Sequence, residues 1–137
     1  MRIVLDTNVL ISGIFFSGPP HQILEAWRDG RVQFVVSPEM LEEYYRVSES
    51  LSEQFPEVNV TPLLALVTIE SYLVQAPAFS EPVSDDPDDD KFLACALASN
   101  TKIIVSGDKH LIRLSGYCGV DILRPSKFVG DYLAKAP

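Results

Sequence analysis

The stretch Ile3-Val4-Leu5-Asp6-Thr7-Asn8 places a continuous apolar and β-branched run directly before an acidic residue. A run of this kind is typical of a strand that is buried on both faces of a parallel sheet. Two further runs of the same character occupy 32–36 and 103–105. Segments with helical periodicity lie between them, around 21–28, 38–51, 61–71 and 88–99. Strands that alternate with helices predict an α/β protein with a parallel sheet.

Weaker signals complete the predicted fold. Positions 72–75 and 121–123 fit two additional strands, and positions 126–135 fit a closing helix. Ser37-Pro38 and Asp86-Pro87 each place a good N-cap residue before a proline at the first helical position, which predicts two helix starts. We therefore expect a three-layer α/β/α sandwich around a central four- or five-stranded, mainly parallel sheet.

Length and composition predict one globular domain over residues 1–137. Hydrophobic residues make up 47% of the chain and charged residues 22%, which is the balance of an ordinary packed protein. No apolar run approaches the roughly 18 to 20 residues that cross a bilayer. Asp6 interrupts the N-terminal apolar stretch before a secretory signal could form. We expect a cytoplasmic protein without a membrane segment.

The net charge of −8 argues against strong, sequence-independent binding of phosphate backbones. Such binding depends on clustered lysine and arginine side chains. A function on nucleic acid would therefore need positive charge from bound divalent cations, from a local basic rim or from a second subunit.

Two acidic residues follow predicted strands. Asp6 comes directly after the strand 3–5, and Asp108 follows the strand 103–105 through Ser106-Gly107. Ligands of open α/β sheets bind at the carboxyl ends of the strands, where the loops diverge. Each aspartate could equally cap the helix that follows it, so the two interpretations stay open at this point.

The predicted helix 38–51 contributes one inward-facing acid. Met40 and Tyr44 lie on its apolar stripe, and helical geometry places Glu43 at the margin of that stripe while Glu42 points to solvent. Taken alone, an acid at this margin is more often a solvated surface residue than a ligand.

The acidic run Asp85-Asp86-Pro87-Asp88-Asp89-Asp90 precedes the apolar helix 88–99. Capping explains Asp86, and a solvated position in the first turn explains Asp88. Asp89 differs, because the residues three, four and seven positions later are apolar and place it in the buried stripe. Asp90 lies nearer the edge of the stripe and is the second choice for the same role. A carboxylate that faces the core needs a cationic partner.

Acids that face inward thus come from four segments, and none has an obvious lysine or arginine partner in the sequence. Hard cations such as Mg²⁺ or Mn²⁺ bind oxygen ligands of this kind and relieve their repulsion. Bound ions of this type activate water and stabilise the oxygens of a phosphodiester. The pattern predicts a metal-dependent phosphodiesterase.

The motifs resemble those of the PIN-domain ribonucleases, in their order and over nearly the whole chain. The matching motifs are Ile3-Val4-Leu5-Asp6-Thr7-Asn8-Val9-Leu10, Ser37-Pro38 with Glu43-Tyr44, Asp86-Pro87-Asp88-Asp89-Asp90, and Ser106-Gly107-Asp108. The subgroup that the chain resembles contains toxin components of toxin-antitoxin modules related to the VapC toxins.

The resemblance implies a PIN-like fold and a Mg²⁺- or Mn²⁺-dependent endoribonuclease that acts on RNA, forms a homodimer and is silenced by an antitoxin protein. It assigns catalysis to the four acids, with Asp90 as an adjacent possibility for the third metal ligand. It also implies that Asn8 and Ser106 position the substrate. The four acids that match the catalytic and metal-binding positions of the family are Asp6, Glu43, Asp89 and Asp108.

Two alternatives remain from the sequence. A non-catalytic, partner-binding regulatory module would use the acids only as helix caps and would favour a basic partner. A metal-dependent phosphatase would use the same ions on a small phosphate ester.

Overall fold

The computed structural model describes residues 1–134 and contains one five-stranded sheet in the order β3-β2-β1-β4-β5. Every neighbouring pair of these strands is parallel. The strands are β1 (Arg2–Leu5), β2 (Gln33–Val36), β3 (Tyr72–Leu73), β4 (Ile103–Val105) and β5 (Asp121–Leu123). The predicted α/β fold is confirmed, with five strands and no antiparallel member among the described residues.

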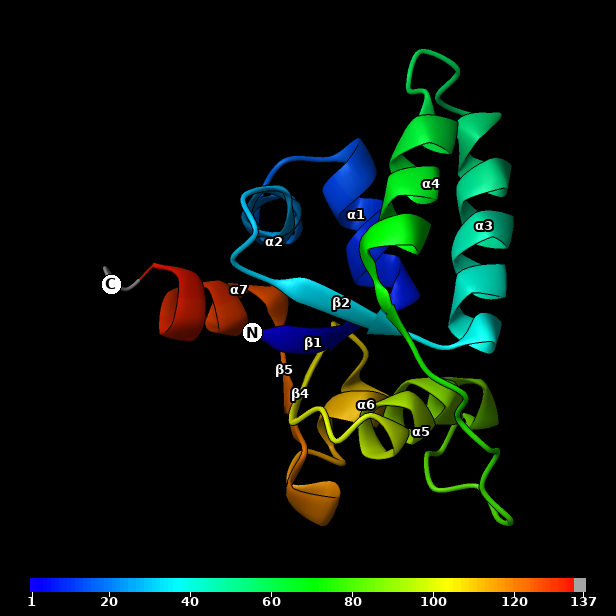
Figure 1. Cartoon of the computed structure of the whole chain (residues 1–137), viewed down its shortest axis with the longest axis vertical. Coiled ribbons are helices and arrows are strands. Elements are labelled where there is room, and N and C mark those ends of the chain that lie inside the picture. The colour runs from blue at the N-terminus through cyan, green and yellow to red at the C-terminus, as the bar shows by residue number, and fades with distance from the viewer. Residues whose placement is uncertain (135–137) are drawn as a thin grey trace.

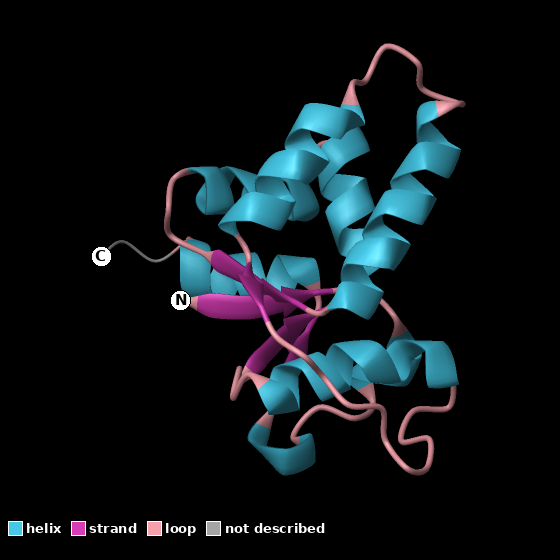
Figure 2. Ribbon diagram, turned by 45° about the vertical axis from the view of Figure 1, so that its right-hand side comes forward, coloured by secondary structure: helices cyan, strands magenta, loops and turns pink. Residues whose placement is uncertain are grey.

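Helices cover both faces of the sheet (Figure 1). They are α1 (Thr7–Phe15), α2 (Pro19–Arg28), α3 (Pro38–Ser52), α4 (Val60–Glu70), α5 (Asp90–Ala98), α6 (Lys109–Ile112) and α7 (Pro125–Phe128). Helices α1 to α4 lie on one side of the sheet, and α5 packs against β1, β2 and β4 on the other side. Figure 2 shows the same layers with the sheet between them. The predicted three-layer sandwich is confirmed.

The strand order explains this division of the helices. The chain moves outward from β1 to β2 to β3, and then returns across the sheet to β4 and β5. Parallel crossovers are right-handed, so connections that run in opposite directions along the sheet place their helices on opposite faces. The order reverses between β1 and β4, and this topological switch point is where open α/β sheets bind their ligands.

The central strands are buried on both faces, as their apolar runs predict. The side chains of Ile3, Val4, Phe34, Val35 and Ile104 are fully buried. The register pairs Ile3 with Phe34 and Val4 with Ile104, so the apolar runs meet side by side. No helix within residues 1–134 has both the length and the apolar character that a membrane crossing requires.

Some elements differ from their predictions. Helix α1 was not predicted, because its sequence is rich in β-branched residues and lacks a polar stripe with helical spacing. The predicted helix start at Asp86-Pro87 exists, but its first turn, Pro87–Asp89, is a 3₁₀ turn before α5. The predicted closing helix 126–135 is α7 followed by a π-helical turn at Val129–Leu133. Position 135 of that prediction lies outside the described residues.

Candidate active site

Asp6 and Asp108 follow the two strands that flank the switch point. Leu5 pairs with Val105 in the sheet, and the Asp6 amide donates to the Val105 carbonyl at 3.0 Å. The Ser106 hydroxyl then joins the two acids, because it donates to Asp6 Oδ2 at 2.6 Å and accepts from the Asp108 amide at 3.0 Å. The sheet register and one buried hydroxyl therefore bring these acids together.

Both aspartates also cap helices, so the capping interpretation is correct, and it accounts for one oxygen of each carboxylate. Asp6 Oδ1 accepts from the Asn8 amide at 3.3 Å at the start of α1. Asp108 Oδ1 accepts from the His110 amide at 2.8 Å at the start of α6. Each cap involves one carboxylate oxygen and fixes the direction of the other. Capping thus orients the acids and leaves one oxygen of each for other contacts.

Asp89 lies near Asp6 and Asp108 and comes from the start of α5, on the face of the sheet opposite to α1. It is 9% exposed, and its Oδ2 has no hydrogen-bond partner among the described residues. Burial, the hydrogen bond with Asp108 and the charges of Asp108, Asp6 and Asp86 together raise the pKa of Asp89 to about 7, and burial is the largest of these causes. The Asp89 carboxyl group therefore lies in a pocket that disfavours its negative charge.

The pKa of Asp6 is also shifted by its neighbours in this cluster. Burial raises its pKa above the ordinary value, while the hydrogen bonds from Ser106 and the Asn8 amide act in the opposite direction. The negative charges of Glu43 and Asp108 raise the pKa further. Asp6 is thus close enough to Glu43, Asp89 and Asp108 for its charge to interact with the charge of each of them.

Glu43 differs from the three aspartates because it has cationic partners. Its Oε1 lies 2.8 Å from Lys91 Nζ and 3.7 Å from Arg46 Nη2, and its Oε2 accepts a hydrogen bond from the Thr7 hydroxyl. The expectation that none of the four acids has a lysine or arginine partner is therefore wrong for Glu43. The predicted orientations are confirmed, since Glu43 is half-buried and Glu42 is exposed.

Tyr44 fixes the helix that carries Glu43. Its fully buried hydroxyl donates to the carbonyl oxygen of Leu5, the residue before Asp6. Burial raises the pKa of Tyr44 well above its ordinary value, so the phenol remains a donor. This bond attaches α3 to the carboxyl end of β1 and sets the position of Glu43 relative to Asp6.

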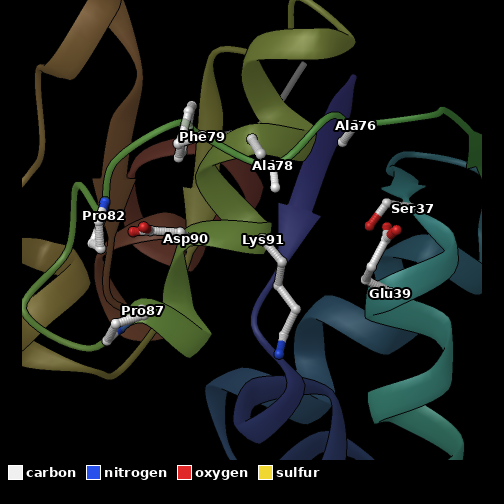
Figure 3. Close-up of a pocket in the computed structure, with 10 residues that line it drawn as sticks. Ser37, Glu39, Ala76, Ala78, Phe79, Pro82, Pro87, Asp90 and Lys91 are labelled. Carbon is white, nitrogen blue, oxygen red and sulfur yellow. The ribbon is translucent and has the colours of Figure 1, made fainter.

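Asp90 does not join the cluster. Its carboxylate accepts from the Val83 amide at 2.9 Å and from the Ser84 amide at 2.7 Å, which anchors the segment 76–87 to α5. Figure 3 shows Asp90 directed toward Pro82, whereas the Lys91 side chain extends in a different direction, toward the helices of the other layer. The alternative of Asp90 as the third metal ligand is thus disfavoured, because its side chain is directed toward the segment 76–87, whose amides stabilise its charge.

Two hollows lie near these residues. One, of about 330 Å³, is lined by Asn8, Ser12, Gly107 and Asp108 among others, and so places Asn8 beside one acid of the cluster. Ser106 does not line it and is fully buried, so Ser106 orients the acids and does not reach a bound substrate. The second hollow, of about 290 Å³, lies beneath the segment 76–87 and contains none of the four acids (Figure 3).

The donor set of the cluster fits a hard divalent ion. Within residues 1–134, no three acidic, histidine or cysteine side chains already form an arrangement that would enclose an ion. The buried and unpartnered Asp89 Oδ2 nevertheless points to a missing cation, because such an oxygen is strongly disfavoured without one. Asp6, Asp89 and Asp108 could hold Mg²⁺ or Mn²⁺ through oxygen atoms alone.

Lys91 is a member of the site that the sequence patterns did not predict. A helical projection places Lys91 away from Asp89, and within residues 1–134 Lys91 forms its ion pair with Glu43 and not with Asp89. The projection gives the direction of the Cβ atom only, and a flexible lysine stem reaches a partner on another helix. The one available signal was its place as the single basic residue directly after the acidic run.

These features define a doubly wound α/β protein with carboxylates gathered at the switch point of its sheet. The family model described as PIN domain matches residues 2–110, and the chain belongs to this family. PIN domains are typically nucleases, and they generally use divalent metal ions. No curated protein matches the chain significantly.

Proposed function

We propose that the protein is a Mg²⁺- or Mn²⁺-dependent endoribonuclease that hydrolyses RNA phosphodiester bonds within a single nuclease domain. Asp6, Asp89 and Asp108 would hold the ion, and Glu43 is the fourth acid of the catalytic centre. The observation that carries this proposal is the buried Asp89 Oδ2, which has no hydrogen-bond donor in the described residues. Helix capping explains the positions of Asp6 and Asp108, but it leaves this oxygen unexplained.

The bound ion would supply an activated water and stabilise charge on the phosphodiester oxygens. The chain itself supplies the orientation of the acids. Ser106 sets Asp6 relative to Asp108, and Tyr44 sets the helix of Glu43 relative to β1. Asn8 is exposed and lines the same hollow as Asp108, and in this proposal its amide would donate a hydrogen bond to the substrate. A site oriented in advance by buried partners needs little rearrangement during the reaction.

Cleavage of single-stranded RNA in Mn²⁺ tests the proposal. We expect cleavage by the wild-type protein and not by the Asp6→Asn variant. Asp121→Asn is the matched control, because Asp121 is exposed at the opposite, amino edge of the sheet. Equal activity of wild type and Asp6→Asn would point to a contaminating nuclease. Hydrolysis of p-nitrophenyl phosphate without RNA cleavage would indicate a phosphatase instead.

A second measurement tests the ion without relying on activity. An ion that binds only the folded chain stabilises it by about 2.7 kcal/mol when its concentration is 100 times its dissociation constant. We expect Mn²⁺ to raise the melting temperature of wild type and Asp121→Asn, but not that of Asp6→Asn. No shift in any of the three proteins would favour the partner-binding module, in which the acids serve only as caps.

We further propose that this nuclease is the toxin of a toxin-antitoxin module, acts in the cytoplasm as a homodimer and is silenced by an antitoxin protein. The support is the ordered set of motifs that resembles the VapC-related toxins. Induced expression in a bacterial host should arrest growth, and the Asp6→Asn variant should not. Arrest by both proteins would show that the effect does not depend on cleavage.

A further inference from the structure

Lys91 gives the acidic site a cation of its own. Its Nζ lies 2.8 Å from Glu43 Oε1, and its side chain is only 20% exposed. Arg46, the other cation beside Glu43, lies 3.7 Å away and is 67% exposed. Lys91 is therefore held inside the site, whereas Arg46 remains in solvent at its rim.

The ammonium group of Lys91 has capacity for a further ligand. A lysine ammonium carries three hydrogen-bond donors and no acceptor. Glu43 is the only polar partner of Lys91 Nζ among residues 1–134, and its second close contact is with the ring of Phe92 at 5.7 Å. Donors thus remain for an anion that approaches Lys91 beside Glu43.

Glu43 is not left without compensation when Lys91 turns to such an anion. The Thr7 hydroxyl donates to its other oxygen, and Arg46 lies within ion-pair distance. The same contacts compete with any role of Glu43 as an ion ligand, because Lys91 and Arg46 already offset its negative charge. The three aspartates have no lysine or arginine partner within residues 1–134. The site is thus divided into a part that needs a metal ion and a part that holds a lysine.

We propose that Lys91 is a catalytic residue that contacts the phosphate group of the RNA at the cleaved bond, and that Glu43 positions Lys91 and does not ligate the ion. This inference rests on the proposed ribonuclease function. A phosphate that approaches four carboxylates on a chain of net charge −8 is repelled, and a protein cation beside Glu43 reduces that repulsion. Lysine binds phosphate as a compact point charge, which suits a position crowded by carboxylates.

RNA binding without metal provides a first test. Fluorescence anisotropy of a labelled single-stranded RNA is measured in EDTA, where no cleavage occurs, with wild type, Lys91→Met and Lys102→Met. Lys102 is the matched control, because it is exposed at the amino edge of the sheet, before β4. We expect Lys91→Met to weaken binding about tenfold and to reduce the slope of log affinity against log salt by about 0.7. Lys102→Met should change neither quantity, and equal binding by all three proteins would overturn the role of Lys91.

A double-substitution cycle separates contact with phosphate from simple neutralisation of Glu43. Cleavage in Mn²⁺ is compared for Lys91→Met, Glu43→Gln and the double variant. If Lys91 only neutralised Glu43, removing both charges would restore activity. We expect the double variant to remain as slow as Lys91→Met, with Lys91→Arg recovering part of the rate because the charge is kept. Melting temperatures in EDTA show which variants are folded. If Lys91→Met does not fold, the comparison of Lys91→Arg with wild type still tests the role of the lysine.

Mn²⁺ binding tests the assignment of Glu43. The Mn²⁺-induced shift in melting temperature should persist in Glu43→Gln and disappear in Asp108→Asn. Loss of the shift in Glu43→Gln would make Glu43 an ion ligand and overturn this half of the inference. Failure of the wild-type chain to cleave RNA would reject the ribonuclease function, and the binding measurement would still decide whether Lys91 contacts phosphate. Cleavage at equal rates by wild type and Lys91→Met would reject Lys91 alone.

Discussion

Asp89 and Asp90 are neighbours in one acidic run, yet they belong to two different regions of the molecule. Asp89 faces Asp6 and Asp108 at the carboxyl edge of the sheet, and its Oδ2 has no donor within residues 1–134. Asp90 faces the segment 76–87, where the amides of Val83 and Ser84 donate to both of its oxygens. The Asp89 carboxylate thus keeps one oxygen without a donor among the described residues, whereas both oxygens of Asp90 accept hydrogen bonds that anchor a loop.

The contrast shows what distinguishes a functional acid from a structural one in this chain. Both residues are aspartates near the start of the same helix, so propensity and local charge do not separate them. The difference lies in the partners that each side chain meets. A carboxylate that accepts backbone N–H bonds is stabilised as an anion, whereas one that meets other carboxylates needs a proton or a cation.

The largest expected effect is on cleavage by the Asp89→Asn variant. Asparagine keeps the size of the side chain but removes the negative charge that would hold the ion. We expect the rate of RNA cleavage to fall at least about 100-fold, because loss of partners one shell further out already reduces metal affinity or activity 10- to 100-fold. Initial rates at saturating Mn²⁺ would measure it. Near wild-type rates would remove Asp89 from the site.

The Asp90→Ala variant should show the reverse pattern. It removes two hydrogen bonds to a charged acceptor, and each such bond contributes about 1.5 to 3 kcal/mol. We expect a loss of about 3 kcal/mol in the free energy of unfolding, measured with urea, and an unchanged Mn²⁺-induced stabilisation. Loss of Mn²⁺ binding in Asp90→Ala but not in Asp89→Asn would assign the third ligand to Asp90.

The Ser106→Ala variant tests how the two other aspartates are held. The hydroxyl links Asp6 to the Asp108 amide, so its removal lets both carboxylates move without changing the charge of the site. We expect cleavage to slow about tenfold, as for other groups that orient ligands. Ser106→Thr keeps the hydroxyl in a larger side chain and should retain more activity. Equal rates for Ser106→Ala and wild type would mean that the sheet register alone positions the acids.

The smallest effect is on the pH dependence of stability without metal. In the folded chain the pKa of Asp89 is about 7, above its ordinary value of 3.8. Between about pH 4 and pH 7 the folded state therefore holds a proton that the unfolded state releases, and stability falls as pH rises through this window. We expect a decrease of at least about 1 kcal/mol, since one pKa unit corresponds to about 1.4 kcal/mol. Urea unfolding in EDTA at pH 5 and pH 8 should show this decrease in wild type and a smaller one in Asp89→Asn.

Much of the fold was predictable because it depends on local patterns. The apolar runs predict three strands that the structure confirms, and Ser37 and Asp86 cap the turns that their sequences predict. Helix α1 was missed because a segment that is apolar on most sides has no helical period to detect. Within the site, the burial of Asp89 followed from its spacing to apolar neighbours along one helix.

The sequence by itself determined the order of strands and helices, the acids that face inward, and the strand ends at which Asp6 and Asp108 lie. Only the tertiary structure decided which of these acids receives a partner. Lys91 pairs with Glu43, and two backbone amides donate to Asp90. Asp89 Oδ2 receives no donor from the described part of the chain. The physical reason is the different distance along the chain over which these interactions act. Periodicity and capping act between residues a few positions apart, whereas the charge of a buried carboxylate is balanced by groups that only folding brings within a few ångströms.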